Sequence, residues 1–316
     1  MKAMVITANG PPEVFQEREL PVPEPGPNQL LVKVYATTVN PVDYKIRRSG
    51  AFGYGPGSVL GFDAAGVVEK TGAAVRDFKA QDEVFYSPDF SGPGAYAQYH
   101  VVDAGIVAPK PANLSFLEAA AVPLAGMTAW DAIVERGGLR VAQSVLIHGA
   151  SGGVGSWATQ LAHAAGAYVF AVCAAPNVAL VRSLGADHVI ERNQLDFAQV
   201  VAQETGGRGV DLVFDCFGGD LVARSIAIVK PMGKIVTIVN PSGELSLAYR
   251  RNVSIHFEFL RRDRDFLLAL QSLLERQVIK PVISRVLTLE DVAEAHRTLE
   301  KGGGFGKIVL TVGQGK

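Results

Sequence analysis

The sequence predicts an α/β protein with two domains, one built on a doubly wound parallel sheet and one rich in short strands. Three observations lead to this fold class. The chain has 316 residues, which is more than a single hydrophobic core usually organises. From Val145 to Phe257, apolar strand-like runs alternate with helical stretches, as in a parallel sheet of about six strands. Residues 1–114 instead show short strands separated by turn signals, which favours a β-barrel-like module.

The stretch from Val145 to Cys173 predicts one strand–helix–strand unit. A short apolar run ends at His148 and is followed by the glycine-rich segment Ala150–Gly155. A helical stretch then runs to Ala165 and is closed by a glycine, before a second apolar run ends at Cys173. The order of strand, glycine turn and helix is the context that a dinucleotide-binding fingerprint requires.

The glycine turn is a variant of that fingerprint, with the pattern A-x-G-x-x-G. Gly152 lets the backbone approach a pyrophosphate, and Gly155 lets the helix pack closely on the strand. The free N–H groups and the positive end of the helix face the phosphates, so Ser151, Gly152, Gly153 and Val154 are expected to bind them. The alternative is a glycine-rich turn in some other α/β domain.

The other elements follow from the same patterns. A hairpin is expected within residues 1–25, and the remaining helices are expected at Asp43–Arg47, Phe116–Ala121, Gly126–Glu135, Phe266–Gln277 and Glu290–Lys301. The strands of the first part are expected at Gln29–Ala36, near Val59–Val68, at Asp82–Phe85 and at Ala97–Val102, with a last strand at Lys307–Val312. The parallel sheet continues with His188–Ile190, Leu212–Asp215, Lys234–Val239 and Val253–Phe257.

Composition excludes several classes of function. A net charge of −1 argues against nucleic acid or an anionic membrane surface as the main partner. The apolar runs are too short to span a bilayer, and the N-terminus turns polar too early for a signal peptide. Cys173 and Cys216 are the only cysteines, so neither a disulfide framework nor a four-cysteine zinc site is possible. We expect a reduced, cytoplasmic protein.

Eight segments, in this order and spacing, resemble the zinc-independent quinone oxidoreductases of the medium-chain dehydrogenase/reductase, or alcohol dehydrogenase-like, superfamily. Their forms at residues 40–45 (NPVDYK) and 61–66 (GFDAAG) are most similar to the enone reductase-like branch. The resemblance implies a GroES-like catalytic domain from residues 1–121 and 254–316, and a Rossmann domain at 122–253. The segments are TTVNPVDYKIR (37–47), VLGFDAAGVV (59–68), GAYAQYHVV (94–102), AAAVPLAGMTAW (119–130), HGASGGVG (148–155), VRSLGADHVI (181–190), VDLVFDCFGG (210–219) and GKIVL (306–310).

Two positions depart from the zinc-dependent relatives. Zinc alcohol dehydrogenases have a cysteine where Asn40 stands and a histidine where Phe62 stands. An amide and a phenyl ring cannot complete the open three-ligand site that catalytic zinc requires, so we expect no metal. Asp63 is expected to pair with an arginine or lysine in a structural role.

The turn at residues 40–45 is implied by the resemblance to face the nicotinamide and the substrate. Asn40 and Asp43 are then cofactor-binding residues, with the Asn40 amide on the ribose or carboxamide. Lys45 would contact the same region and stabilise negative charge on a carbonyl oxygen as hydride arrives at the β-carbon. Tyr44 is a candidate proton donor. Two plainer interpretations stay open: a solvated Lys45, and a Tyr44 that only packs.

Further cofactor contacts are expected at the carboxyl edge of the parallel sheet, where dinucleotides lie. Cys216 and Phe217 follow the fourth strand, and Val239 and Asn240 end the fifth. The resemblance adds Thr128, Phe259 and Lys307 as positions near the nicotinamide or lining its cleft.

The end of the second parallel strand indicates which nicotinamide cofactor binds. NAD sites usually place an acid there for the ribose 2′-hydroxyl. Here the segment Cys173, Ala174, Ala175, Pro176 and Asn177 has no acid, which favours NADPH. A basic residue is common in this loop in the family, but Asn177 replaces it, so Arg182 or Arg192 could reach the 2′-phosphate instead.

These features predict an NADPH-dependent reductase that transfers hydride to a small-molecule quinone or α,β-unsaturated carbonyl, without zinc. The resemblance and the apolar stretches at Lys234–Pro241 and Val253–Phe259 also predict a homodimer joined through the Rossmann sheets. Two alternatives remain open. One is an enoyl-thioester reductase, although no basic cluster for a coenzyme A phosphate is evident. The other is a weakly catalytic NADPH-binding redox sensor or structural protein.

Overall fold

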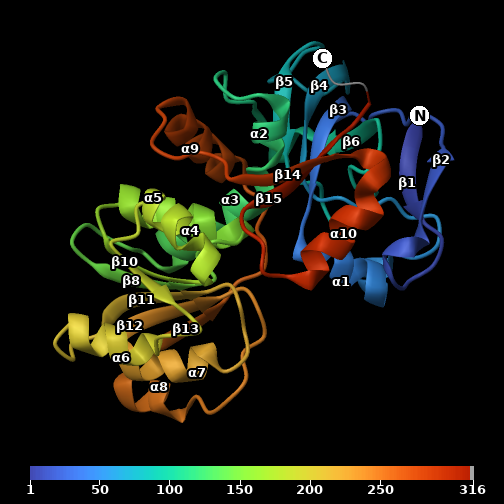
Figure 1. Ribbon diagram of the computed structural model, residues 1–316. Helices are drawn as coiled ribbons and strands as arrows, with labels where there is room; N and C mark the ends of the chain where they lie inside the picture. Colours follow the sequence, from blue (N-terminus) through green and yellow to red (C-terminus); the bar gives the residue numbers. More distant parts are fainter. Residues whose placement is uncertain (314–316) are drawn as a thin grey trace. The chain divides into compact units, whose positions relative to one another are not determined.

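The chain forms two compact units in a computed structural model that describes residues 1–313 (Figure 1). The first unit contains Met1–Leu124 and the chain from Arg262 onward, and the second contains Ala125–Arg261. The predicted α/β fold, with a strand-rich unit and a six-stranded parallel sheet, is confirmed. Within the described residues, no helix has the length and apolar character needed to cross a membrane.

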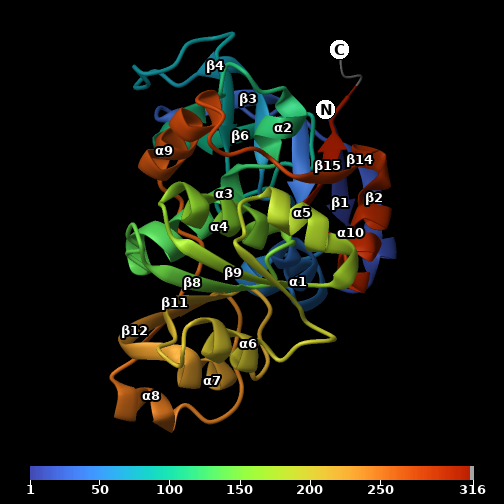
Figure 2. The same cartoon turned by 60° about the vertical axis from the view of Figure 1, so that its left-hand side comes forward.

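The second unit is built on a parallel sheet with the strand order β10-β9-β8-β11-β12-β13. Every neighbouring pair in it is parallel, so all six strands end at one edge. Helices α4 and α5 cover one face, and α6, α7 and α8 cover the other (Figures 1 and 2). The strands are β8 (Ser144–His148), β9 (Tyr168–Cys173), β10 (His188–Glu191), β11 (Val210–Asp215), β12 (Val229–Thr237) and β13 (Ser254–Phe257). The helices are α3 (Pro123–Trp130), whose first two residues belong to the first unit, α4 (Gly153–Ala164), α5 (Val178–Ser183), α6 (Phe197–Glu204), α7 (Leu221–Ser225) and α8 (Ser246–Arg251).

A hydrophobic core lies between this sheet and the helices on one of its faces. Leu146, Val213 and Ile235 from three neighbouring strands are fully buried and pack with Phe197 and Val201 of α6. Strands buried on both faces read as continuous apolar runs, which is why these segments were recognisable in the sequence.

The first unit contains two sheets. Strands β1 and β2 form an antiparallel pair, and seven others form a sheet with the order β14-β15-β3-β4-β5-β7, in which β6 also pairs with β3. The strands are β1 (Lys2–Ile6), β2 (Phe15–Glu19), β3 (Gln29–Val39), β4 (Ala64–Thr71), β5 (Glu83–Tyr86), β6 (Tyr99–Asp103), β7 (Val107–Pro109), β14 (Ile283–Thr288) and β15 (Lys307–Thr311). The helices are α1 (Pro41–Ser49), α2 (Phe116–Ala120), α9 (Arg264–Glu275) and α10 (Val292–Lys301).

The structure differs from the sequence expectation in a few elements. Strands β7 and β14 were not expected. They are the two end strands of their sheet, and β14 is mostly half-buried or exposed, so it lacks a strong apolar pattern. The helix expected at Gly126–Glu135 is α3 followed by a π-helical segment at Asp131–Arg136. Strand β12 begins at Val229 rather than at the expected Lys234. Pro231 lies in the added part, where the pairing with β11 shifts register.

The boundary between the units also lies later than expected. A boundary after residue 253 would place Ser254–Phe257 in the first unit. This segment is β13, which pairs with β12 in the parallel sheet, so the second unit extends to Arg261. The other boundary follows Leu124 rather than residue 121.

Candidate cofactor and substrate site

The glycine turn connects the end of β8 to the start of α4. Gly149 has a φ of +75°, which suits glycine, and its carbonyl accepts from the Gly152 N–H at 3.0 Å. Gly152 is the N-cap of α4, and its carbonyl accepts the N–H of Ser156 at 2.9 Å. The first N–H groups of the helix have no partner within it, so Gly153 and Val154 present donors at the edge of the sheet.

Gly155 permits the close packing of α4 on this turn. A Cβ atom added at Gly155 would overlap the carbonyl oxygen of Gly149 and lie 2.8 Å from the Ala150 Cα. Backbone cannot move aside as the end of a side chain can, so residue 155 must be glycine for the helix to begin here. The turn therefore has the geometry that the fingerprint requires of a pyrophosphate cradle.

The segment after β9 is joined to the glycine turn by a side-chain hydrogen bond. The buried Asn177 amide donates to the Ser151 hydroxyl at 3.0 Å. Cys173 is buried at the end of β9, and its carbonyl accepts the Arg192 N–H at 3.0 Å. The guanidinium of Arg192 lies 5.4 Å from the centre of the exposed Phe217 ring. Five of the predicted cofactor residues are thus brought together.

The ends of β11 and β12 are held by the fully buried Asp215, which sequence reasoning missed. One of its carboxylate oxygens accepts the N–H groups of Phe217 and Gly218 at 2.9 and 3.0 Å. The other accepts the Thr237 hydroxyl at 3.0 Å, and that hydroxyl accepts the Val239 N–H at 3.3 Å. Asp215 was recognisable only as the last residue of a buried strand.

The remaining predicted residues of the second unit lie on several elements. Ala174 is half-buried and Ala175 is exposed in the loop after β9, and Arg182 is exposed on α5. Cys216 follows β11, and burial raises the pKa of its thiol well above the ordinary value. Three others complete the set, namely the exposed Asn240 after β12, the exposed Phe259 after β13 and the buried Thr128 on α3.

In the first unit, a buried polar cluster surrounds the start of α1. The carboxylate of Asp63 accepts hydrogen bonds from the Asn40 amide at 2.8 Å and from the Lys307 ammonium at 3.1 Å. Its other oxygen accepts the Leu124 N–H at 2.7 Å, and the Thr38 hydroxyl also donates to this carboxylate. The Lys307 ammonium donates to the Asn40 amide oxygen as well. We call Asn40, Asp63 and Lys307, all less than 5% exposed, the Asp63 cluster.

The Asp63 cluster confirms that Asp63 pairs with a basic residue. The partner, Lys307, is 244 positions away on β15, and the antiparallel pairing of β15 with β3 places it opposite Asn40. An isolated carboxylate in this interior would be unfavourable, and the ammonium and the amide together satisfy it.

A second buried chain of hydrogen bonds supports the same turn. Asp43 accepts from the Asn40 N–H and from the Tyr96 hydroxyl, the latter at 3.2 Å. Tyr96 contacts the Nε2 of His296 at 3.1 Å, and the Nδ1 of His296 contacts the Arg47 guanidinium at 2.8 Å. Arginine can only donate, so Nδ1 accepts, Nε2 carries the proton and donates to Tyr96, and Tyr96 donates to Asp43.

Burial sets the protonation of this chain. Burial raises the pKa of Asp43 to about 8, against the hydrogen bond from Asn40 and the charge of Lys307, which lower it. Burial, together with the charge of Arg47, lowers the pKa of His296 to about 3. At neutral pH the histidine is therefore neutral, which agrees with its role as an acceptor for arginine. Sequence reasoning missed Tyr96, His296 and the internal position of Arg47, because no local pattern links them.

The two predicted catalytic residues lie on the outer side of α1. Lys45 is exposed, and its ammonium has no hydrogen-bond partner among residues 1–313. Tyr44 is half-buried, with the Arg48 guanidinium 5.7 Å from its ring centre. Asn40 and Asp43 occupy the start of the same helix and are buried. The predicted turn therefore divides into an interior pair and an outer pair.

The residues at the positions of the zinc ligands are of different chemistry. The Asn40 amide is bonded to Asp63 and Lys307, and Phe62 is fully buried against Tyr54 and Phe90, with ring centres 5.8 and 4.6 Å away. Across residues 1–313, no group of three or more His, Cys, Asp or Glu side chains is arranged so that it could hold a metal ion.

A strand-rich unit and a parallel sheet with a glycine turn define the class of alcohol dehydrogenase-like oxidoreductases. Two family models match the chain: the alcohol dehydrogenase GroES-like domain at residues 26–112 and the zinc-binding dehydrogenase at 184–310. Similar solved structures include an NAD-dependent alcohol dehydrogenase, at 33% identity and a TM-score of 0.93 over 99% of this chain and 100% of that chain. Another is Escherichia coli quinone oxidoreductase complexed with NADPH, at 29% identity and a TM-score of 0.89 over 98% and 100%.

Sequence relatives give the narrower assignment. The chain is 31% identical to Homo sapiens quinone oxidoreductase, over 98% of this chain and 97% of the relative. It is 35% identical to 2-methylene-furan-3-one reductase of Solanum lycopersicum, over 98% of this chain and 79% of the relative. The chain belongs to the quinone oxidoreductase family, and the second relative supports its place in the enone reductase-like branch.

Proposed function

We propose that this protein uses NADPH to reduce a quinone or an α,β-unsaturated carbonyl compound, and that it does so without zinc. The observation that carries the proposal is the composition of the Asp63 cluster. Its carboxylate and amide oxygens accept from the Lys307 ammonium, and Phe62 provides no metal-binding atom. These groups do not supply the three ligands of catalytic zinc, which supports hydride transfer to an acceptor that is already electrophilic.

NADPH would supply a hydride when bound, and the described residues fit it. The free N–H groups of Gly153 and Val154 would bind its pyrophosphate at the positive end of α4. Ser151 and Gly152 would contact it from the turn, where the Gly152 N–H already donates to Gly149. Asn177 fixes the Ser151 hydroxyl. The segment 173–177 carries no acid, and the exposed Arg192 follows Glu191, which pairs with Cys173 at the end of β9. The remaining predicted contacts at this edge are Cys173, Ala174, Ala175, Cys216, Phe217, Val239, Asn240, Phe259 and Thr128.

The first unit would supply the groups that act on the acceptor. Lys45 would place its unpaired ammonium near the oxygen on which negative charge develops, which lowers the barrier. Asn40, Asp43 and Lys307 would hold the turn at residues 40–45, which we expect to face the nicotinamide, in one conformation. The proton that completes the reduction would come from Tyr44 or from water.

A spectrophotometric assay tests this proposal. Purified protein is mixed with NADPH and a panel of quinones, enones and an enoyl-thioester, and its zinc content is measured in the same samples. We expect oxidation of NADPH with a quinone or an enone at far less than one zinc per chain. A Gly152→Glu variant, which places a carboxylate at the pyrophosphate site, should lose this turnover and so controls for contaminating reductases. Turnover that requires zinc would contradict the proposal, and so would turnover with the enoyl-thioester alone.

The predicted homodimer is also a proposal, and the edge strand β13 supports it. β13 ends the six-stranded sheet, and Phe257 and Phe259 at its end are 59% and 61% exposed. An unpaired strand edge with exposed aromatic side chains favours pairing across a two-fold axis. Light scattering should give twice the chain mass, and a mass near one chain at micromolar concentration would contradict this.

A further inference from the structure

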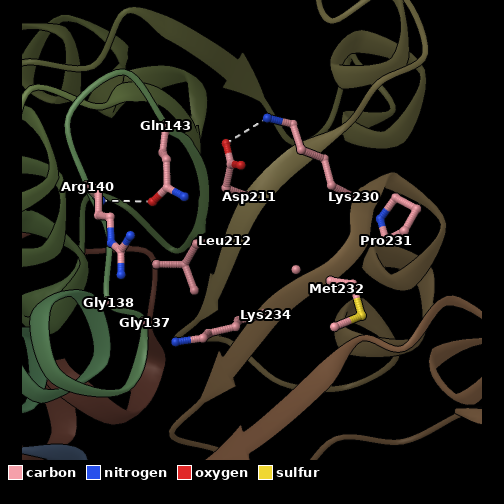
Figure 3. Close-up of a pocket in the computed structure, with 11 residues that line it drawn as sticks. Gly137, Gly138, Arg140, Gln143, Asp211, Leu212, Lys230, Pro231, Met232 and Lys234 are labelled. Atoms are coloured by element: carbon pink, nitrogen blue, oxygen red, sulfur yellow. Dashed lines mark hydrogen bonds and ion pairs between the residues drawn. The ribbon is translucent and has the colours of Figure 1, made fainter.

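A pocket in the second unit lies at the edge of the sheet opposite the glycine turn (Figure 3). Its volume is about 230 Å³, and it is lined by residues around the starts of β11 and β12 and by the loop that precedes β8. Parallel strands place their starts and ends at opposite edges, so this pocket is separate from the carboxyl edge proposed for the cofactor. The function proposed above makes no use of it.

The charge balance of the pocket is positive. Arg140, Lys230 and Lys234 line it, together with one carboxylate, Asp211. That carboxylate is already satisfied, since it accepts from Lys230 at 2.8 Å and from the N–H of Ser144 at 2.8 Å. Burial alone would raise the pKa of Asp211, but the bonds from Lys230 and Ser144 hold it below the ordinary value. Two cationic groups therefore remain without a counter-charge.

These two groups are available to a ligand. The Lys234 ammonium donates one hydrogen bond, to the Arg136 carbonyl at 2.9 Å, which fixes it and leaves two donors. The guanidinium of Arg140, on an exposed residue, has no partner among residues 1–313. Figure 3 shows the ends of both side chains directed toward the space beside Leu212.

The backbone around the pocket keeps this space open. Gly138 has a φ of +60°, and a Cβ atom there would lie 3.3 Å from the Lys234 ammonium. On the other side, Met232 has a φ of +66° and is 75% exposed, so its side chain leaves the pocket unfilled. A non-glycine residue in this conformation is uncommon and costs about 1 kcal/mol or more.

We infer that this pocket binds a small anion that carries a phosphate group. A phosphate monoester has close to two negative charges at neutral pH, which match the two uncompensated cations. Its tetrahedral oxygens accept from several directions, and the guanidinium of Arg140 can donate two parallel hydrogen bonds to them. The volume holds a phosphate with a few carbon atoms and is below the usual range for larger organic ligands.

Amide NMR on the full-length protein tests this inference, with glycerol 3-phosphate as the probe. We expect shifts at the amides of Gly138, Met232 and Gly233 with a dissociation constant of about 1 mM. In an Arg140→Gln variant the affinity should fall about tenfold, the usual loss for one hydrogen bond between charged groups. Arg250→Gln, at an exposed position of α8, is the matched control and should bind as the wild type does.

Two further probes define the ligand class. Glycerol carries no charge and should cause no shifts, and lactate should bind more weakly than the phosphate. Shifts confined to the glycine turn, no shifts at all, or equal affinity in Arg140→Gln would overturn the site. Lactate binding as tightly as glycerol 3-phosphate would overturn the assignment to a phosphate.

Discussion

The two units present the groups proposed for binding and catalysis in opposite ways. At the carboxyl edge of the second unit the groups are mainly backbone N–H donors and uncharged side chains, held by the glycine turn and by Asp215. At the start of α1 in the first unit they are buried, charged and mutually bonded, as in the Asp63 cluster. Backbone geometry suffices to bind a cofactor that many proteins share, whereas a particular acceptor requires particular side chains.

This comparison predicts that the members of the Asp63 cluster depend on one another for their contribution to the free energy of unfolding. Removing one member of a buried ion pair leaves an uncompensated charge and costs about 3 to 5 kcal/mol. Asp63→Asn and Lys307→Met should each lower the free energy of unfolding by that amount. Combined, they should cost clearly less than the sum of the two, as measured by chemical denaturation. Additive losses would show that the ammonium and carboxylate do not depend on one another.

Substitution of Lys45 tests whether the exposed face of α1 takes part in catalysis. Removing a group that stabilises a developing oxyanion typically lowers kcat by about 10² to 10³. Lys45→Met keeps most of the stem, so kcat should fall while the NADPH dissociation constant and the unfolding temperature stay unchanged. Arg48→Met on the same helix is the comparison variant. Normal kcat in Lys45→Met would leave Lys45 as a solvated surface lysine.

Substitution of Arg192 tests whether this residue of the second unit binds the 2′-phosphate of NADPH. If its guanidinium contacts the 2′-phosphate, Arg192→Gln should weaken NADPH binding about tenfold and leave NADH binding unchanged. Fluorescence titration with both cofactors measures this difference. Arg182→Gln, on the neighbouring helix, separates the two candidates. A wild-type preference for NADH would contradict the preference for NADPH that we infer from the absence of an acid at residues 173–177.

Asp43 should make stability depend on pH. Because burial raises its pKa to about 8, the native state keeps a proton that the unfolded chain releases near its ordinary value of 3.8. The unfolded state therefore binds fewer protons at this site across the window, and the contribution of Asp43 to stability falls as pH rises toward 8, by up to about 1.4 kcal/mol per pH unit. In denaturation series from pH 5 to 8, Asp43→Asn should lose this contribution, so that the difference in stability between the variant and the wild type changes with pH by that amount. Asp220→Asn, at an exposed position, should retain the contribution.

The fold and the glycine turn were predictable because local patterns encode them. Buried parallel strands give continuous apolar runs, and the packing at Gly155 can be met by glycine alone. The internal contacts of the first unit were not predictable in the same way. Tyr96 and His296 meet across 200 positions, and Asp63 meets Lys307 across 244. Neither contact has a local pattern, and only the pairing of a buried carboxylate with some basic residue could be anticipated.

Deuterium transfer from NADPH tests the central claim most directly, which is hydride transfer to an electrophilic acceptor without a metal. The protein is treated with a chelator and mixed with a simple enone and NADPH in which both C4 hydrogens are replaced by deuterium, and the product is analysed by mass spectrometry and NMR. The account predicts one deuterium at the β-carbon of the product, at a rate that chelation leaves unchanged. Product without deuterium at that carbon, or turnover restored only by added zinc, would contradict it.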